Sequence, residues 1–255
     1  MPRFILLCEL VGKVAAVWCW VREPGSLAGY AWFFAPDPLV FYHLFVPSAQ
    51  GFCRTFTRFE TPRPEIWLTI DDGPDPDDTP QILELLEHHQ ARATFFLIGE
   101  RAAQWPQLVA EIARRGHEVG HHTQRHPVGT LWCATRARLN AELDDALAVF
   151  RAAGVRPTRF RAPVGIKHFL LGGALASREL ACVGWSVRSG DCLGRRAEDV
   201  VASVMRRVKP GAIVLVHEGP SVPDALRVRT IALLLDALRA RGISCVIPEA
   251  KQLRP

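Results

Sequence analysis

The feature that most constrains this chain is an alternation, from residue 65 onward, of short apolar runs with amphipathic stretches. Most of the apolar runs are continuous, which is typical of parallel strands covered by helices. Strands are expected over residues 66–71, 93–98, 117–122, 159–163, 181–187, 212–218 and 243–247, and helices over 79–89, 100–116, 135–154, 197–208 and 227–242. No GxGxxG follows the first strand, so a dinucleotide-binding fold has no support. The pattern predicts an α/β fold, a (β/α) barrel that is irregular or incomplete.

Length and composition fit a single barrel of this kind. The chain has 255 residues, of which 49% are hydrophobic and 22% charged, as in an ordinary globular protein. The net charge is +5, but Lys and Arg are scattered rather than clustered, so no nucleic-acid partner is expected. The 7 cysteines form no CxxC and no even framework, which favours reduced thiols and a cytoplasmic location.

Residues 1–60 differ from the rest and are expected as an apolar N-terminal extension, with residues 61–255 as the catalytic barrel. The run 4–21 contains Glu9 and Lys13, which argues against a signal peptide and against a charge-free membrane span. The aromatic-rich run 30–47 contains Asp37 and two prolines. Two interpretations stay open: a segment packed on one end of the barrel, or peripheral membrane contact through residues 4–47.

Polar side chains stand at the ends of the predicted strands, where barrels of this kind place their chemistry. Two adjacent carboxylates, Asp71 and Asp72, end the first strand within TIDDGP, residues 69–74. Later strands end at or just before the remaining candidates, which are His121, His122, His126, Arg161, Asp191 and His217. A buried pair of like charges costs desolvation and repulsion unless a cation or a proton-transfer role uses it.

His122 and His126 form a His-x-x-x-His pair that could grip one divalent ion. Pro127 disfavours α geometry at His126, so we expect a turn or a frayed helix start there. On its own, a pair of histidines at this spacing is more often exposed to solvent or capping a helix than binding a metal. Joined to a carboxylate, it has the pattern of a catalytic metal site with open coordination positions. One aspartate would then bind the metal and the other act as a base, with a twist or bulge turning both toward the site.

Five ordered motifs resemble those of the polysaccharide deacetylase family (carbohydrate esterase family 4, NodB homology domain). They are TIDDGP, HTQRH, RAPVG, the region around Asp191, and LVH, and the match covers roughly residues 65–250. The resemblance implies a distorted (β/α)7 barrel that removes N- or O-acetyl groups from sugars. It also implies one divalent metal ion. Zn²⁺ is the expected ion, and Co²⁺, Ni²⁺ and Mn²⁺ are the alternatives.

The resemblance implies a role for each matching residue. The metal ligands would be Asp72, His122 and His126. Asp71 would be the general base, oriented and kept ionised by Arg161. His217 would protonate the leaving amine, with Asp191 holding its imidazolium. The pocket would use Leu215 against the acetyl methyl group and the backbone N–H of Val164 toward the oxyanion.

The chain departs from the family pattern around the pocket. Arg188 and Cys192 stand where the fourth motif, D-x-x-D-W, has its first Asp and its Trp, and Val164 replaces a frequent aromatic residue. His121 stands where Asn is common. One wall of the pocket is therefore expected to be altered.

The expected function is that of a metal-dependent hydrolase that removes an acyl group from an amino sugar in a glycan or a lipid-linked precursor. The expected acyl group is N-acetyl. Because no signal peptide is evident, we expect it in the cytoplasm, with the inner face of the membrane as a site of association. Two alternatives stay open: a non-catalytic metal- or sugar-binding protein on the same fold, and a hydrolase of cyclic imides or other non-sugar amides. Intact Asp71 and His217 speak against the first. The sugar, acetyl versus formyl, and the oligomeric state are left open.

Overall fold

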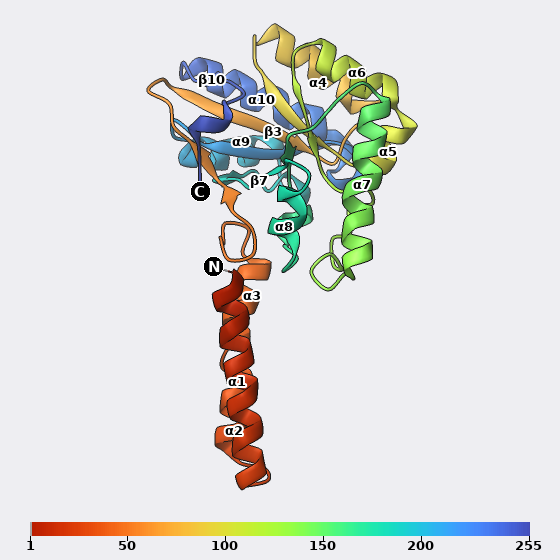
Figure 1. Ribbon diagram of the computed structural model, residues 1–255. Coiled ribbons are helices and arrows are strands. Elements are labelled where there is room, and N and C mark those ends of the chain that lie inside the picture. The colour runs from red at the N-terminus through yellow and green to blue at the C-terminus, as the bar shows by residue number, and fades with distance from the viewer. Residues whose placement is uncertain (1) are drawn as a thin grey trace.

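A curled parallel sheet forms the centre of the molecule. The computed structural model describes residues 2–255 (Figure 1). Its main sheet has the order β1-β7-β6-β5-β4-β3-β9-β8, and β10 pairs with β3. The strands are β1 (Thr55–Phe56), β3 (Glu65–Asp71), β4 (Ala93–Leu97), β5 (Glu118–His121), β6 (Arg159–Phe160), β7 (Ala181–Val183), β8 (Val187–Arg188), β9 (Ile213–His217) and β10 (Ser244–Cys245). All pairs in this sheet are parallel.

Strands β7 and β8 show how far the sheet curls. They lie near opposite ends of the strand order, yet only residues 184–186 separate them in the chain. The four Cα–Cα steps from Val183 to Val187 span about 14 Å at most, so the two ends of the sheet must approach one another. The predicted distorted barrel is confirmed in this incomplete, curled form. A smaller antiparallel pair joins β2 (Arg58–Phe59) to β11 (Leu253–Arg254).

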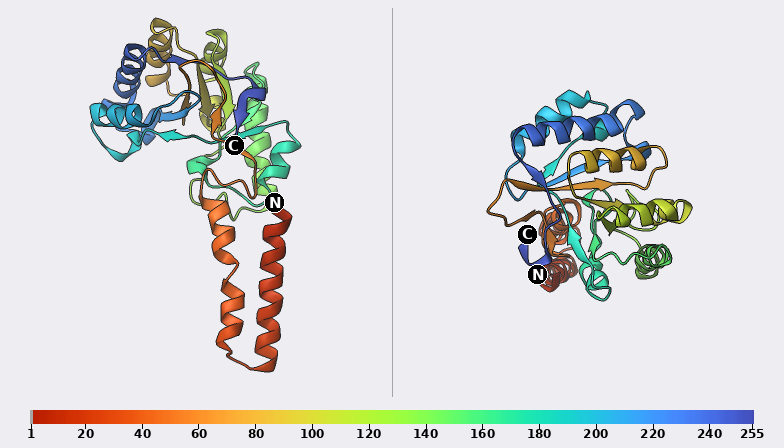
Figure 2. Two further views of the ribbon diagram at one scale, coloured as in Figure 1. Left: turned by 90° about the vertical axis from the view of Figure 1, so that its left-hand side faces the viewer. Right: turned by 90° about the horizontal axis from the view of Figure 1, so that it is seen from above.

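Helices cover the outside of the sheet, as Figure 2 shows from above. They are α4 (Asp78–His88), α5 (Gly99–Gln104), α6 (Pro106–Arg114), α7 (Arg136–Ala152), α8 (Leu171–Ala176), α9 (Ala197–Arg207) and α10 (Arg227–Ala240). Short 3-10 turns lie at Pro163–Gly165, Asp191–Leu193, Gly219–Ser221, Asp224–Leu226 and Ala250–Gln252. The largest core cluster packs Ile66, Leu68 and Ile70 of β3 against apolar residues of α4 and α10, because helical residues spaced three and four apart share one face.

Three predicted elements differ from the structure. The helix expected over 100–116 is two helices, because Pro106 cannot donate a backbone hydrogen bond and Trp105 between them is not helical. The strand expected over 181–187 is broken between β7 and β8, where the chain passes to the other end of the sheet. Of residues 159–163, only Arg159 and Phe160 pair as a strand. The sheet also begins at Thr55 in β1, so the expected boundary between residues 60 and 61 lies inside the domain.

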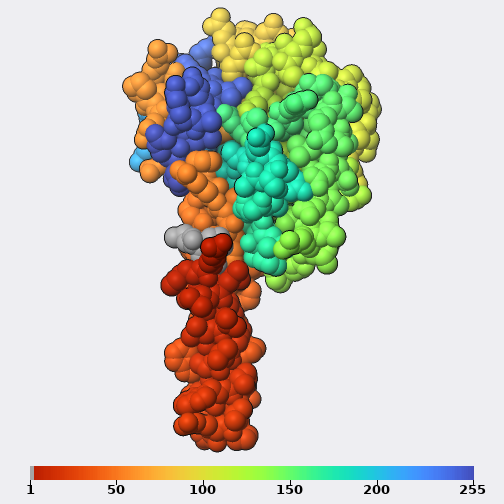
Figure 3. All heavy atoms as spheres, viewed as in Figure 1, coloured from red at the N-terminus to blue at the C-terminus, as the bar shows by residue number. Residues whose placement is uncertain are grey.

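The N-terminal hairpin, residues 2–45, projects away from the catalytic domain (Figures 1 and 2). Its first arm is α1 (Pro2–Arg22), and its second arm is α2 (Leu27–Phe34) followed by α3 (Asp37–Phe45). The space-filling view shows it as a narrow stalk (Figure 3). Most of the segment projects from the domain (Figure 1), and its base packs there, where Ile5 and Leu44 form a core cluster with Phe52. By length and composition alone, α1 could cross a membrane.

Candidate active site

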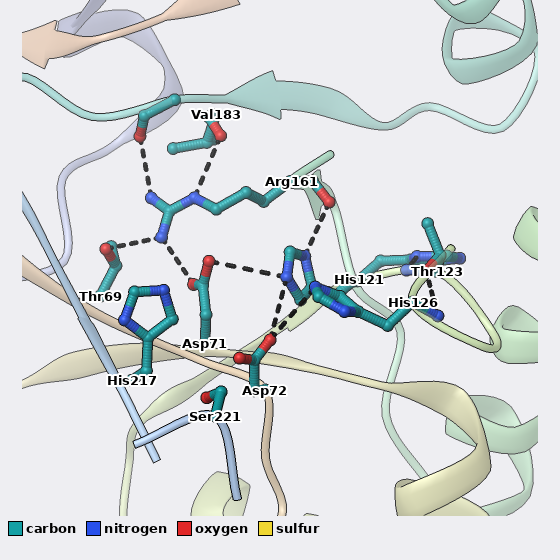
Figure 4. A network of polar contacts seen from close by, with 12 residues as sticks. Thr69, Asp71, Asp72, His121, Thr123, His126, Arg161, Val183, His217 and Ser221 are labelled. Atoms are coloured by element: carbon teal, nitrogen blue, oxygen red, sulfur yellow. Dashed lines mark hydrogen bonds and ion pairs between the residues drawn. The ribbon is translucent and has the colours of Figure 1, made fainter. Parts of the chain in front are cut away.

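The paired carboxylates end β3 at the C-terminal edge of the sheet. Asp71 and Asp72 are both buried, with 3% and 7% exposure. Successive strand residues point to opposite faces, but Asp72 has φ 75°, a left-handed conformation that Asp tolerates better than most residues. This turn provides the twist that the sequence required, and both carboxylates face the same site (Figure 4).

Asp72 lies against two imidazoles. Its Oδ1 atom is 3.4 Å from His122 Nε2 and 3.3 Å from His126 Nε2. The second histidine arrives on a turn rather than on a helix, with φ 53° at His126 and its N–H donating to Thr123 Oγ1 at 3.0 Å. The turn expected before Pro127 is therefore present, and the His pair does not depend on helical spacing.

The donor set fits a divalent metal ion. One ligand atom from each of Asp72, His122 and His126 lies within 4.8 Å of the others, and Asp72 Oδ1 is buried without a hydrogen-bond donor. His122 Nδ1 lies 2.9 Å from the Arg161 carbonyl oxygen, which can only accept, so Nδ1 carries the proton and the Nε2 lone pair faces the site. Two imidazole nitrogens and one carboxylate oxygen suit Zn²⁺.

Electrostatics are consistent with cation binding there. Burial raises the pKa of Asp72, but the adjacent His122 imidazole and the positive charge of His217 outweigh it and hold that pKa well below its usual range. Burial, with a smaller contribution from His122, lowers the pKa of His126 to about 4. At neutral pH the carboxylate is charged and the His126 imidazole is neutral, which are the forms that bind metal.

Asp71 is oriented by Arg161, which is fully buried. The guanidinium donates from Nη1 to Asp71 Oδ1 at 2.7 Å and to Thr69 Oγ1 at 2.8 Å. It also donates to the carbonyl oxygens of Val183 and Gly184, so its donors are shared among several strands (Figure 4). The other carboxylate oxygen, Asp71 Oδ2, lies 3.7 Å from His122 Nε2, beside the candidate metal position.

His217 and Asp191 form a hydrogen-bonded pair on the other side of the site. His217 Nδ1 donates to Asp191 Oδ1, and the His217 backbone N–H donates to Asp191 Oδ2, both at 2.8 Å. Burial lowers the pKa of His217, but hydrogen bonds to Asp191 and Cys192, together with the charges of Asp191 and Asp71, raise it well above its usual value. His217 is therefore protonated at neutral pH, with Nε2 available to give a proton.

A second group of potential metal ligands consists of Asp191, Cys192 and His217. Here His217 Nδ1 already donates to Asp191, and Cys192 Sγ lies 3.3 Å from the same nitrogen. Because the carboxylate and imidazole already satisfy one another, this group fits a metal ion less well than Asp72 with its two histidines.

A cavity of about 210 Å³ lies over these groups. It is lined by Asp71, Asp72, His122, His126, Val128, Val164, Trp185, Arg188, Cys192, Leu215, His217 and Ser221. Val164 and Leu215 thus reach the same pocket, and Val164 stands in the left-handed region with φ 49°. A β-branched residue rarely adopts this conformation, so the loop after β6 holds it under strain.

The positions of four residues near the site differ from what the sequence pattern indicates. His121 was expected at the rim but is buried behind it, with Nε2 donating to the Leu143 carbonyl at 2.9 Å, because it alternates with His122. Trp185, Val128 and Ser221 line the cavity but were not predicted. Trp185 was assigned to a continuous strand, and only its position after Gly184 hinted at a break.

Fold and site together define a hydrolase built on a curled parallel α/β sheet. The model of the family described as polysaccharide deacetylase matches residues 58–171. A chitooligosaccharide deacetylase from Bradyrhizobium sp. (strain ANU 289) is 37% identical over 189 residues, covering 69% of this chain and 85% of that protein. The chain therefore belongs to the polysaccharide deacetylase family, whose members are hydrolases.

Further similarities extend over most of the catalytic domain. A peptidoglycan-N-acetylglucosamine deacetylase from Bacillus cereus is 32% identical over 191 residues, covering 73% of this chain and 88% of that protein. Among solved structures, the peptidoglycan N-acetylglucosamine deacetylase Bc1960 superposes with a TM-score of 0.68 at 28% identity, covering 74% of this chain and 88% of that one.

Proposed function

We propose that this protein is a metal-dependent N-deacetylase that releases acetate from an N-acetylated amino sugar, in a glycan or a lipid-linked precursor. One observation carries the proposal: Asp72, His122 and His126 converge at a buried, donor-free carboxylate oxygen, with Asp71 directly beside them. The named activities of the relatives, on chitooligosaccharides and on peptidoglycan N-acetylglucosamine, support an acetylated amino sugar as the substrate.

The residues divide the reaction between them. A divalent metal ion held by Asp72, His122 and His126, with Zn²⁺ the best match to these donors, would polarise the acetyl carbonyl and acidify water. Asp71 Oδ2 accepts a proton from the attacking water as the new C–O bond forms. His217 Nε2 gives its proton to the nitrogen as the C–N bond breaks, so that acetate and a free amine leave.

Other groups orient the two catalytic side chains and contact the substrate. Arg161 keeps Asp71 Oδ1 occupied, which leaves Oδ2 for the water. Asp191 fixes the His217 ring with its proton toward the pocket. The backbone N–H of Val164 is proposed to donate to the developing oxyanion, and the Leu215 side chain to contact the acetyl methyl group. Intact Asp71 and His217 in this geometry favour catalysis over a purely sugar-binding role.

We further propose a cytoplasmic location at the inner face of the membrane. All seven cysteines are free, which suits a reducing compartment, and the N-terminal hairpin supplies an apolar segment for membrane contact. A lipid-linked sugar would be encountered at that surface.

The test is acetate release by the zinc-loaded protein from a panel of N-acetylated oligosaccharides. Asp71→Asn keeps an oxygen acceptor for Arg161 but removes the base, so kcat should fall by about 10²- to 10⁴-fold, and His217→Ala should act similarly. Asp77→Asn, at an exposed carboxylate in the following loop, is the matched control and should keep full activity. Full activity in Asp71→Asn and His217→Ala would refute the mechanism.

A further inference from the structure

The N-terminal hairpin exposes large apolar side chains on both of its arms. In α1, Leu10 is 61% exposed, Val14 60% and Val17 56%, and in α2, Leu27 is 85% exposed and Phe34 57%. A second copy of the chain could cover one of these faces but not both. A lipid bilayer would cover every side of the hairpin at once.

The interior of the hairpin has the character of a membrane helix pair. Small residues lie between the arms: a Cβ at Gly12 would come within 2.8 Å of the Trp32 carbonyl oxygen, and a Cβ at Gly29 within 2.3 Å of Trp20. Small residues of this kind let membrane helices approach closely. The arms therefore approach closely at these glycines, Gly12 beside the backbone of α2 and Gly29 beside the Trp20 ring.

The charges inside the hairpin are paired with one another. Lys13 Nζ lies 2.8 Å from Asp37 Oδ1 and 3.4 Å from Glu9 Oε2, and the three side chains are only 22–32% exposed. These are the charges that argued against a membrane span in the sequence. Ionisable residues within membranes face the interior of the helix assembly and pair in this way.

The hairpin also has the dimensions of a bilayer. Its first arm, α1, has 21 residues, a length of about 31 Å, against a hydrocarbon core about 30 Å thick. Aromatic residues that suit the interface stand near both ends: Trp20 and Tyr30 contact one another near the tip, and Phe45 contacts Trp132 at the base.

The base of the hairpin is attached to the active-site edge of the sheet. The backbone N–H of Lys167, in the loop after β6, donates to the Leu44 carbonyl, and its ammonium donates to the carbonyls of Val46 and Pro47, each at 2.8 Å. Lys167 lies three residues beyond Val164 in the same loop, and Val164 lines the cavity. The hairpin therefore leaves the domain beside the pocket.

The exposed apolar residues of the catalytic domain gather at the same edge. Among described residues outside the hairpin, only Val128, Val164, Phe169 and Leu193 are large, apolar and exposed. They lie in the loops after β5, β6 and β8, where the C-terminal ends of parallel strands meet. Val128 and Val164 line the cavity itself.

We propose that residues 2–45 span a lipid bilayer as a helical hairpin and that the pocket mouth lies at the bilayer surface, where it takes a sugar carried on a lipid chain. The substrate part of this inference rests on the proposed deacetylase function. The domain side of the hairpin carries Arg3, Arg54 and Arg58, and the tip carries Arg22. This bias places the catalytic domain on the cytoplasmic side.

The first experiment measures membrane retention of the full chain in vesicles of phosphatidylethanolamine and phosphatidylglycerol. The protein should stay with floated vesicles after alkaline carbonate and high-salt washes, because a spanning hairpin is not held by charge. Leu10→Glu with Val17→Glu should abolish retention. The matched control, Ala103→Glu with Ala110→Glu on exposed positions of α5 and α6, should not. Release of the parent protein by the washes, or assembly into soluble oligomers instead, would overturn the proposal.

The second experiment tests whether the hairpin spans. Ser26→Cys at the tip should react with a membrane-impermeant maleimide in intact spheroplasts, whereas native Cys133, exposed on the catalytic domain, should react only in inverted vesicles. The parent chain supplies the labelling baseline. Reaction of both positions from the same side would show a hairpin lying along the surface and would refute spanning.

The third experiment compares kcat/KM for free N,N′-diacetylchitobiose and for N,N′-diacetylchitobiose bearing an octadecyl chain, both with the protein in vesicles. The lipid-carried sugar should be preferred by about tenfold or more because it shares the surface with the enzyme. The Leu10→Glu/Val17→Glu variant should lose this preference and keep its rate on free N,N′-diacetylchitobiose. No preference in the parent would refute the placement of the pocket mouth. Retention without any deacetylation would instead refute the proposed function and leave the hairpin proposal standing.

Discussion

Asp71 and Asp72 are adjacent like charges that the fold separates into two environments. Asp71 pairs with the buried guanidinium of Arg161, and Asp72 faces the nitrogens of His122 and His126. The left-handed conformation at Asp72 makes this possible, because it turns a side chain that would otherwise point to the opposite face. Asp71 therefore has a charged partner in Arg161, and a cation bound by Asp72 and the two imidazoles would offset the repulsion between the two carboxylates.

The pH dependence of activity should depend on the pair His217 and Asp191. The general acid must be protonated, so kcat/KM should hold below the raised pKa of His217 and fall as the pH rises through it. Asp191→Asn removes the negative charge and weakens the hydrogen bond that raises this pKa, so the alkaline limb should move to lower pH.

The measurement is the pH profile of kcat/KM for deacetylation of a chitooligosaccharide. Cys192 and Asp71 also face His217 and remain in place in this variant. Asp199→Asn, at an exposed position on α9, is the control and should leave the profile unchanged. An alkaline limb that stays in place in Asp191→Asn would exclude His217 as the acid.

At the scale of elements, long apolar runs were predictable and short strands were not. Residues 66–71, 93–98 and 212–218 carry enough continuous apolar character to mark β3, β4 and β9. Strands such as β6 and β8 have two residues each. Runs this short have no recognisable sequence pattern, and they are strands only because they pair with segments distant in the sequence. The break between β7 and β8 has the same cause, since sheet curvature is a property of all strands together.

Arg161 connects these short elements, and its loss should destabilise the domain. It follows β6 directly and donates to Asp71 of β3, to Val183 of β7 and to Gly184. Arg161→Leu would leave the Asp71 carboxylate buried without its partner, at a cost of about 3–5 kcal/mol in the free energy of unfolding. Urea denaturation measures this, with exposed Arg156→Leu as the control. A loss no larger than that of the control would contradict the role given to Arg161.

At the scale of the whole molecule, two parts with different surfaces meet at one edge. The catalytic domain buries its apolar side chains except around the pocket, and the hairpin exposes them along its length. Both parts place their apolar surface at the same edge because the hairpin base is hydrogen-bonded to the loop after β6. The candidate catalytic pocket and the apolar hairpin therefore lie next to one another.

Metal removal should affect stability and activity together. A metal that binds only the folded state stabilises it by about 2.7 kcal/mol at 100 times its Kd, so chelation should lower Tm and abolish acetate release. Zinc should restore both. His126→Ala removes one ligand and should show no Tm change with zinc. Full activity in a chelated sample shown to be metal-free by atomic absorption would refute metal dependence.

The sequence by itself determined which residues stand at the C-terminal strand ends, and hence most of the candidate site, because parallel strands bring those ends to one edge whatever their order. It also determined the apolar character of residues 2–45. Only the tertiary structure decided that His121 lies buried behind the site, that Trp185 lines the pocket, and that the N-terminal segment projects from the pocket edge with its charges paired. These features arise from backbone turns and from contacts between segments far apart in the chain, which local patterns do not encode.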